Sequence, residues 1–225
     1  MKEEYSIAKE NTLKGRLFRF FLWVFVAPII RLIWIKKVQG LQNLPKSGPY
    51  IVAANHQSFL DFITLVCIFP ERLVFLAAEK FYTSGFWRPI MEYTGQIKVE
   101  REAEDKSGVI NKGLEVLGQG MVLALFPQGT RSRSGEIEKT YTGVARFALG
   151  ANVPVIPVGI KGAFRVMAPN EKTPKVKKAI EINIGAPIDL SRHKAGLPGP
   201  LVYRQATNEV MRKIAELAGK DYKDE

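Results

Sequence analysis

The architecture of this chain follows from residues 50–61, which read Tyr50-Ile-Val-Ala-Ala-Asn55-His56-Gln57-Ser58-Phe59-Leu60-Asp61. An apolar run ends abruptly in a polar cluster, and a second apolar run follows over residues 62–69. This pattern predicts a buried strand at 50–54, a tight turn and a helix. The turn contains His56, one of 2 histidines in the chain, and Asp61 follows just inside the helix.

The spacing of His56 and Asp61 permits contact only under one condition. Residues five apart on a regular helix differ by roughly 140° and do not face each other, so His56 must lie in the turn and fold back over the helix start. In one interpretation, Ser58 and Asp61 form a capping box and His56 is incidental. In the other, His56 is a general base oriented by Asp61. The helix dipole favours the neutral form of the imidazole, whereas the negative charge of Asp61 favours the protonated form. Both interpretations therefore stay open.

The composition predicts one globular domain with an anionic partner. The chain has 225 residues, of which 46% are hydrophobic and 24% charged, and this length is sufficient for a sizeable core. The net charge of +11 indicates a nucleic acid, an anionic membrane or a phosphorylated substrate as partner. The single cysteine, Cys67, lies in the second apolar run and is expected to be a small buried hydrophobe.

An apolar segment near the N-terminus is marginal for crossing a membrane. The uninterrupted run covers residues 20–30 and reaches Ile35 if Arg31 is included. A helix of that extended length is roughly 24 Å long, against a hydrocarbon core of about 30 Å. Pro28 predicts a break or a kink, with residues 29–37 as a second short element. No small-residue cleavage site follows, so a signal peptide is not indicated.

Positive charge accompanies this apolar surface. Residues 1–50 contain nine lysines and arginines and three acids, which account for +6 of the net charge of +11. Trp23 and Trp34 suit a membrane interface. We therefore predict that residues 1–37 form two membrane-anchoring helices on an anionic phospholipid leaflet, the alternative being a helix buried on the core or in a partner interface. Nucleic acid binding is disfavoured, because the cations alternate with a large apolar surface.

Residues 38–225 are predicted to form an α/β domain with a mixed, largely parallel sheet flanked by helices. A short strand and turn are expected at 38–45. Further strands are expected at 50–54, 73–78, 97–99, 121–126, 153–160 and 177–184, and helices at 62–69, 86–93, 106–117, 143–149 and 201–217. The basic segment 170–178 is predicted to be a surface loop.

A second polar cluster follows the predicted strand 121–126. It reads Pro127-Gln128-Gly129-Thr130-Arg131-Ser132-Arg133. Ligands of open α/β sheets bind at the loops after the carboxyl ends of strands. Gly129 permits close backbone approach, and Arg131 offers a bidentate fork suited to phosphate. Arg101 ends another short strand and is a candidate for the same site. The alternatives are an ordinary exposed loop and, for Arg101, a surface salt bridge.

Four segments together resemble the motifs of the glycerolipid acyltransferases. They are Asn55-His-Gln-Ser-Phe-Leu-Asp61, Gly95-Gln-Ile-Lys-Val-Glu-Arg101, Phe126-Pro-Gln-Gly-Thr-Arg-Ser132 and Val153-Pro-Val-Ile-Pro-Val-Gly159. Their order and spacing over residues 38–184 match the family, and the bacterial 1-acyl-sn-glycerol-3-phosphate (lysophosphatidic acid) acyltransferases are the most similar members.

The resemblance implies a reaction at the cytoplasmic face of the cell membrane. The hydroxyl of lysophosphatidic acid would attack the thioester of acyl-CoA or acyl carrier protein, giving phosphatidic acid without a metal or organic cofactor. It implies that His56 is the general base and that Asp61 orients it. It assigns phosphate binding to Arg101, Gly129, Thr130 and Arg131, and acyl-donor binding or site shape to Pro157. Glycerol 3-phosphate and other lysophospholipids remain alternative acceptors.

Two positions depart from the family pattern. Gln128 replaces the usual Glu of the third motif, which removes a negative charge beside Arg131 and keeps hydrogen-bonding capacity. Glu100 replaces the usual Asp before Arg101. Because of Gln128, a weakly active membrane-binding family member is a further alternative.

Overall fold

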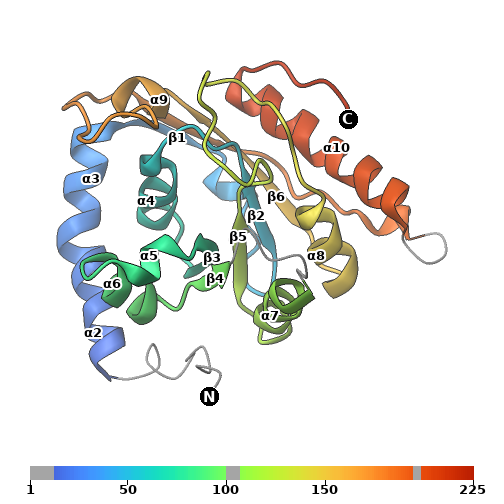
Figure 1. Ribbon diagram of the computed structural model, residues 1–225, viewed down its shortest axis with the longest axis horizontal. Helices are drawn as coiled ribbons and strands as arrows, with labels where there is room; N and C mark the ends of the chain where they lie inside the picture. Colours follow the sequence, from blue (N-terminus) through green and yellow to red (C-terminus); the bar gives the residue numbers. More distant parts are fainter. Residues whose placement is uncertain (1–12, 100–106, 195–198) are drawn as a thin grey trace.

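A computed structural model describes residues 13–99, 107–194 and 199–225. Seven strands form one sheet in the order β1-β7-β6-β2-β5-β3-β4, with helices on both faces (Figure 1). All neighbouring strands are parallel except β6 and β7. The predicted fold class, a mixed and largely parallel sheet flanked by helices, is therefore confirmed.

The strands agree closely with the sequence pattern. They are β1 (Ile35–Gln39), β2 (Ile51–Ala54), β3 (Leu73–Ala78), β4 (Ile97–Val99), β5 (Val122–Leu125), β6 (Val155–Lys161) and β7 (Ile180–Ile184).

The helices include two short ones, α5 and α9, that the sequence pattern did not predict. They are α2 (Leu13–Phe21), α3 (Ala27–Trp34), α4 (Phe59–Ile68), α5 (Lys80–Thr83), α6 (Trp87–Thr94), α7 (Ser107–Gly118), α8 (Gly143–Ala151), α9 (Ala163–Val166) and α10 (Pro200–Ala218). A π-helical segment, η1 (Leu22–Val26), joins α2 to α3, and 3₁₀ turns lie at Leu41–Asn43 and Ser191–His193.

Strand β2 lies at the centre of the sheet, between two apolar layers. Val52 packs in a cluster with Leu65 of α4, whereas Ala53 points to the other face and packs in a cluster with Phe147 of α8. Both faces of β2 are therefore covered, which explains why residues 50–54 are continuously apolar rather than alternating.

The direction of the strands places three loops at one edge of the sheet. Strand β2 is parallel to both of its neighbours, β5 and β6, so the carboxyl ends of all three point the same way. The turn after β2, which contains His56, consequently lies between the loops after β5 and β6. Ligand sites of open α/β sheets occur at such an edge.

Of the break or kink predicted at Pro28, the break does not occur. Residues Leu13–Trp34 form one continuous helical run, seen along one flank of the molecule in Figure 1. The Ala27 N–H donates to the Leu22 carbonyl, five residues back, in the π-helical turn just before Pro28. Such a turn rearranges the carbonyls that the proline ring would otherwise meet, so the helix continues through the proline.

The predicted second element at 29–37 corresponds to α3, but its predicted end lies three residues too far along the chain. The helix ends at Trp34, and Ile35 already belongs to β1, where it pairs with Ile180 of β7. The Trp34 carbonyl accepts a hydrogen bond from the Ala179 N–H. These partners lie far away in the sequence, so the local pattern carries no sign of them. Residues 35–37 thus belong to the sheet, across the predicted boundary at 37/38.

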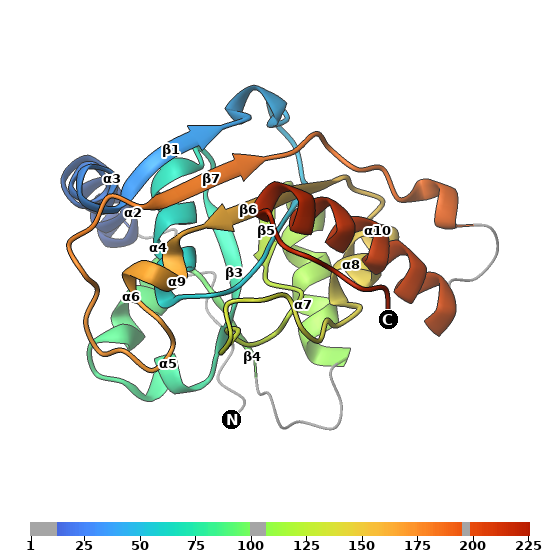
Figure 2. The same ribbon diagram turned by 90° about the horizontal axis from the view of Figure 1, so that it is seen from above.

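The N-terminal helix lies against the domain along much of its length. Phe18 packs on Tyr93 of α6 with a ring-centroid distance of 5.8 Å, and the Arg31 guanidinium donates to the Cys67 carbonyl of α4, with Nε at 2.8 Å. Figure 2 shows the helix nearly end-on beside β1 and α4, with α10 toward the other end of the molecule.

The outer face of this helix carries an exposed apolar surface. Among the described residues, only Leu13–Trp34 is long and apolar enough to cross a membrane by length and composition, and 6% of its most apolar window is buried. A helix buried on the core, one of the two alternatives, is therefore not what the structure shows. The exposed side chains are Leu13, Leu17, Phe20, Phe21, Trp23, Phe25, Ile29 and Leu32.

Candidate active site

The turn after β2 brings His56 and Asp61 together. Helix α4 begins after Ser58, and Ser58 and Asp61 form both halves of a capping box. Asp61 Oδ2 accepts hydrogen bonds from the Ser58 N–H at 2.7 Å and the Gln57 N–H at 2.6 Å, and it lies 2.9 Å from His56 Nδ1. The capping geometry and the His–carboxylate contact therefore coexist, and His56 folds back over the helix start as the spacing requires.

The Asp61 carboxylate defines the tautomer of His56. A carboxylate can only accept, so neutral His56 carries its proton on Nδ1 and leaves Nε2 as the basic nitrogen. Asp61 is 0% exposed, while the His56 side chain is 15% exposed. The acid is thus shielded from water, and the imidazole remains accessible. This arrangement can accept a proton at Nε2 while the ring orientation is held.

Phe126 packs against the imidazole. The two rings stack with centroids 3.9 Å apart and planes inclined by 9°, and Phe75 lies behind Phe126 at 5.8 Å. The stack restricts the ring of His56 on the side opposite its free face. The sequence reasoning did not single out Phe126 as a site residue, although it begins the Phe-Pro-Gln-Gly motif and directly follows β5.

The loop after β5 is bonded to the backbone of His56. The His56 N–H donates to Gln128 Oε1 at 2.8 Å, and the Ser132 N–H donates to the His56 carbonyl at 2.8 Å. Gln128 is 5% exposed. Its side chain thus positions the turn after β2, and either Gln or Glu supplies the oxygen that this contact needs.

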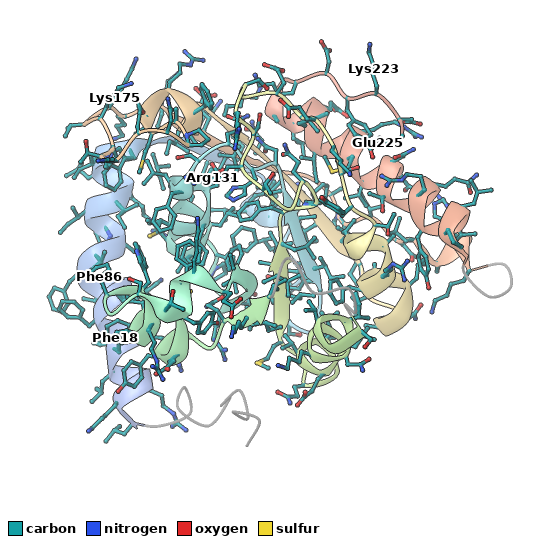
Figure 3. All side chains as sticks on the ribbon, in the orientation of Figure 1. Phe18, Phe86, Arg131, Lys175, Lys223 and Glu225 are labelled. Atoms are coloured by element: carbon teal, nitrogen blue, oxygen red, sulfur yellow. The ribbon has the colours of Figure 1, made fainter. Side chains whose placement is uncertain are left out.

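The same loop presents Gly129, Thr130 and Arg131. Gly129 has a φ of +69°, and a Cβ there would lie 2.9 Å from the Tyr141 ring, so glycine is required. Thr130 is exposed and Arg131 is partly exposed. Within the described parts of the chain, Arg131 has no hydrogen-bond or ion-pair partner, which leaves its guanidinium available to an anion. Figure 3 shows Arg131 near the middle of the molecule.

Asn55 joins the turn after β2 to β6. Its Nδ2 donates to the Ile160 carbonyl at 2.9 Å and its Oδ1 accepts from the Ile160 N–H at 2.7 Å. Ser58 Oγ donates to the carbonyl of Met167, which follows β6 and α9, at 2.7 Å. These contacts fix the turn to the β6 side, whereas Gln128 and Ser132 fix it to the loop after β5.

Comparison with known proteins identifies the family. The profile described as "Acyltransferase" matches residues 35–161, more than half of the chain. The chain belongs to the acyltransferase family. The resemblance of the four motifs to the glycerolipid acyltransferases is thereby confirmed.

The relatives of this acyltransferase are named for one reaction. It is 29% identical over 132 residues to the chloroplastic 1-acyl-sn-glycerol-3-phosphate acyltransferase BAT2 of Brassica napus, covering 58% of the chain and 38% of the relative. It is 33% identical over 137 residues to the 1-acyl-sn-glycerol-3-phosphate acyltransferase of Saccharomyces cerevisiae, and this match covers 59% of the chain and 45% of the relative. The matched stretches thus span less than half the length of these relatives.

A solved structure shares the fold of this acyltransferase. The 1-acyl-sn-glycerophosphate (LPA) acyltransferase PlsC from Thermotoga maritima superposes with a TM-score of 0.69 at 23% identity, covering 96% of this chain and 87% of that one.

Two residues that the motifs predicted for the site need separate mention. Arg101 lies outside the described residues, so its predicted phosphate contact stays a prediction. Pro157 lies within β6, opposite Ala53 of β2, and its carbonyl accepts a hydrogen bond from the Gly185 N–H at 2.8 Å. In this acyltransferase Pro157 is therefore part of the sheet interior. Any influence of Pro157 on donor binding or on the shape of the site is indirect, through the position of β6.

Cys67 is buried on α4, as the sequence predicts. Burial raises the pKa of its thiol to about 11, and the Arg31 guanidinium only partly opposes this. The thiol is protonated at neutral pH, and the thiolate is the nucleophilic form. Cys67 of this acyltransferase therefore has a packing role rather than a nucleophilic one.

Proposed function

We propose that this acyltransferase moves an acyl group from acyl-CoA or acyl carrier protein to the free hydroxyl of 1-acyl-glycerol-3-phosphate, giving phosphatidic acid. The names of the relatives support this acceptor. The contact between His56 and Asp61, at the sheet edge of an acyltransferase fold, is the observation that carries the proposal.

In the proposed reaction, His56 acts as general base and then as general acid. Nε2 takes the proton of the acceptor hydroxyl as its oxygen attacks the thioester carbonyl carbon. The C–S bond of the resulting tetrahedral species then breaks, and the thiolate receives the proton from the imidazolium. Asp61 stabilises the imidazolium and holds the ring. No metal, organic cofactor or covalent enzyme intermediate enters this sequence.

The acceptor phosphate is proposed to bind at the loop after β5. Arg131 supplies a guanidinium with no partner among the described residues, Thr130 supplies a hydroxyl and Gly129 an accessible backbone, and phosphate favours such donors. Arg101 is the fourth proposed contact. The short connection through Gln128 and Ser132 to the His56 backbone supports a phosphate position close to the reacting hydroxyl.

The exposed apolar helix is proposed to anchor the enzyme in one leaflet at the cytoplasmic face of the membrane. The run Leu13–Trp34 is roughly 33 Å long as a helix, enough to span a hydrocarbon core of about 30 Å. Because the helix packs on α4 and α6, however, a perpendicular orientation would draw these elements into the bilayer. A helix lying in the leaflet keeps the domain in water and supports a monotopic enzyme.

A thiol-release assay with acyl-CoA and an acceptor panel tests the proposal. Lysophosphatidic acid should give the highest kcat/KM among lysophosphatidic acid, glycerol 3-phosphate and lysophosphatidylcholine. Turnover with none of these acceptors would refute the proposed activity.

Gln128→Glu tests whether the departure at this position weakens turnover. Since either residue offers an oxygen to the His56 N–H, wild type should already be active, and the variant should change kcat/KM by less than about tenfold, the effect of one ordinary hydrogen bond. An inactive wild type rescued by Gln128→Glu would contradict this. No thioester consumption in either protein would favour the membrane-binding alternative.

A further inference from the structure

A cationic cavity lies beside the turn after β2. It has a volume of about 260 Å³ and is lined by Gln57, Ser134, Gly135, Lys161, Phe164 and Arg165, among others. We call it the β6 cavity, because Lys161 ends β6 and Arg165 lies in the short helix that follows. In Figure 1 the loop after β5, α9 and the C-terminal end of α10 meet at this edge of the molecule.

The β6 cavity is connected to the site by short covalent and hydrogen-bonded paths. Gln57 is the residue after His56. Lys161 is the residue after Ile160, whose backbone is bonded to Asn55 at 2.7 and 2.9 Å. Because β6 is parallel to β2, its carboxyl end also belongs to the edge where ligands of this fold class bind. A ligand in the cavity would therefore lie next to the catalytic turn.

Two of the cations lining the cavity are available to an anion. The side chains of Lys161 and Arg165 have no hydrogen-bond or ion-pair partner among the residues that the structure describes. The Glu181 carboxylate already pairs with Lys36 at 2.7 Å. Lys36 lowers the pKa of Glu181 most, and Lys161 adds a smaller effect. Two cations facing one cavity without a bonded carboxylate are unfavourable for the free protein and favour a bound anion.

Nearby negative groups do not cancel this charge. Lys220 also lines the cavity and pairs with Glu136 at 2.6 Å, so these two neutralise each other. The C-terminal end of α10, a region of partial negative charge, lies beside Lys161 at Gly219. Glu138 accepts a hydrogen bond from Ser134 Oγ, a residue of the lining, and adds one further negative charge nearby. Against two full positive charges at Lys161 and Arg165, one carboxylate and about half an elementary charge from the helix end leave the cavity cationic.

Gln57 contributes a neutral polar side chain to the cavity. It is 3% exposed, and its Nε2 has no hydrogen-bond partner within the described residues. A buried donor without a partner costs about 1–3 kcal/mol. Rotation of the amide by 180° exchanges the positions of Nε2 and Oε1, so this side chain can offer a donor to the cavity that it lines.

We propose that the β6 cavity binds the phosphate of the phosphopantetheine arm that carries the acyl thioester. This inference rests on the proposed function, whose two substrates both carry phosphate. With the acceptor phosphate at Arg131, a second cationic site flanking His56 serves the donor. A volume below about 300 Å³ suits a phosphate and a few adjoining atoms rather than a whole coenzyme. The phosphopantetheine arm is common to CoA and acyl carrier protein, so one site would serve either source.

The test compares Lys161→Gln/Arg165→Gln with the control Lys213→Gln/Lys223→Gln, in the full-length chain. Both variants lower the net charge by the same amount, and the control positions lie outside the lining of the cavity. The cavity variant should raise KM for acyl-CoA and for acyl carrier protein on the order of tenfold or more, as expected for lost charged hydrogen bonds. KM for lysophosphatidic acid and kcat should stay as in the control.

Three outcomes would overturn the inference. The first is a KM for both acyl donors equal to that of the control variant. The second is a raised KM for lysophosphatidic acid in place of the donors. The third is a raised KM for acyl-CoA but not for acyl carrier protein, which would assign the cavity to the nucleotide of CoA. Calorimetric binding of 4′-phosphopantetheine to the His56→Ala protein gives a readout without turnover, with inorganic phosphate as the second probe. Failure of wild type to release thiol would refute the proposed function alone, since this binding measurement still decides the β6 cavity.

Discussion

Replacing Asp61 by Asn separates the capping role of this residue from its catalytic role. Asp61 Oδ2 holds two backbone N–H groups and His56 Nδ1, while Oδ1 has no partner among the described residues. Asn has nearly the same shape. The two N–H donors favour its carbonyl oxygen at the position of Oδ2, so the capping box and the ring orientation should be preserved. The charge is lost.

The expected loss of activity follows from that charge. When His56 takes a proton, the imidazolium lies roughly 4 Å from the carboxylate charge, an interaction of about 4 kcal/mol at an effective dielectric constant near 20. Each 1.36 kcal/mol changes a rate tenfold, so Asp61→Asn should lower kcat/KM by about 10³-fold. Weakening two charge-assisted hydrogen bonds at the helix start should cost about 2 kcal/mol of stability, or roughly 4–8 °C in Tm.

Thiol release and thermal unfolding, measured on the same samples, test this reasoning. Rates are divided by the folded fraction from circular dichroism, so a loss of stability is not counted as a loss of catalysis. His56→Ala should be inactive, and His56→Ala/Asp61→Asn should be no slower than His56→Ala, because the two residues act as a unit. If Asp61→Asn kept more than about a tenth of the wild-type kcat/KM, the Asp61 charge would stabilise the transition state by less than about 1.4 kcal/mol. Asp61 would then be a helix cap only.

The remaining predictions concern the anchor, the turn and the thiol. Phe20→Ser/Phe25→Ser removes aromatic side chains that are 61% and 57% exposed. The double variant should bind anionic vesicles about a hundredfold more weakly, a loss near 3 kcal/mol of binding free energy. Unchanged sedimentation with the vesicles would contradict the anchoring role. Asn55→Ala leaves the N–H and the carbonyl of Ile160 without their side-chain partner. A denaturant titration should show a loss of roughly 2–4 kcal/mol in the free energy of unfolding. A loss below about 1 kcal/mol would mean that water replaces the amide. Since the raised pKa of Cys67 leaves roughly 0.1% thiolate at pH 8, thiol reagents should label the native protein far more slowly than the denatured protein, and rapid native labelling would refute its burial.

The local pattern of the sequence was sufficient for most elements of the fold. Continuous apolar runs mark strands covered on both faces, and a polar cluster at the end of such a run marks the edge of a parallel sheet. Gly95 follows the last residue of α6 and Gly118 ends α7, close to the ends expected for the helices at 86–93 and 106–117. Ser58 and Asp61 already encoded the helix start, and the motif order indicated the family. These features are local, because they depend on backbone preferences and on the burial of neighbouring residues.

Other features were decided by the tertiary structure, since their partners lie far apart in the chain. Ile35 joined the sheet because β7 offers it a parallel partner at Ile180. Pro28 stayed within a helix because a π-helical turn accommodates its ring, a choice that propensity alone disfavours. The sequence left capping and catalysis as alternatives for Asp61, and the three-dimensional arrangement showed one oxygen making both sets of contacts. The charge of the β6 cavity likewise became visible only when Gln57, Lys161 and Arg165 were brought to one place.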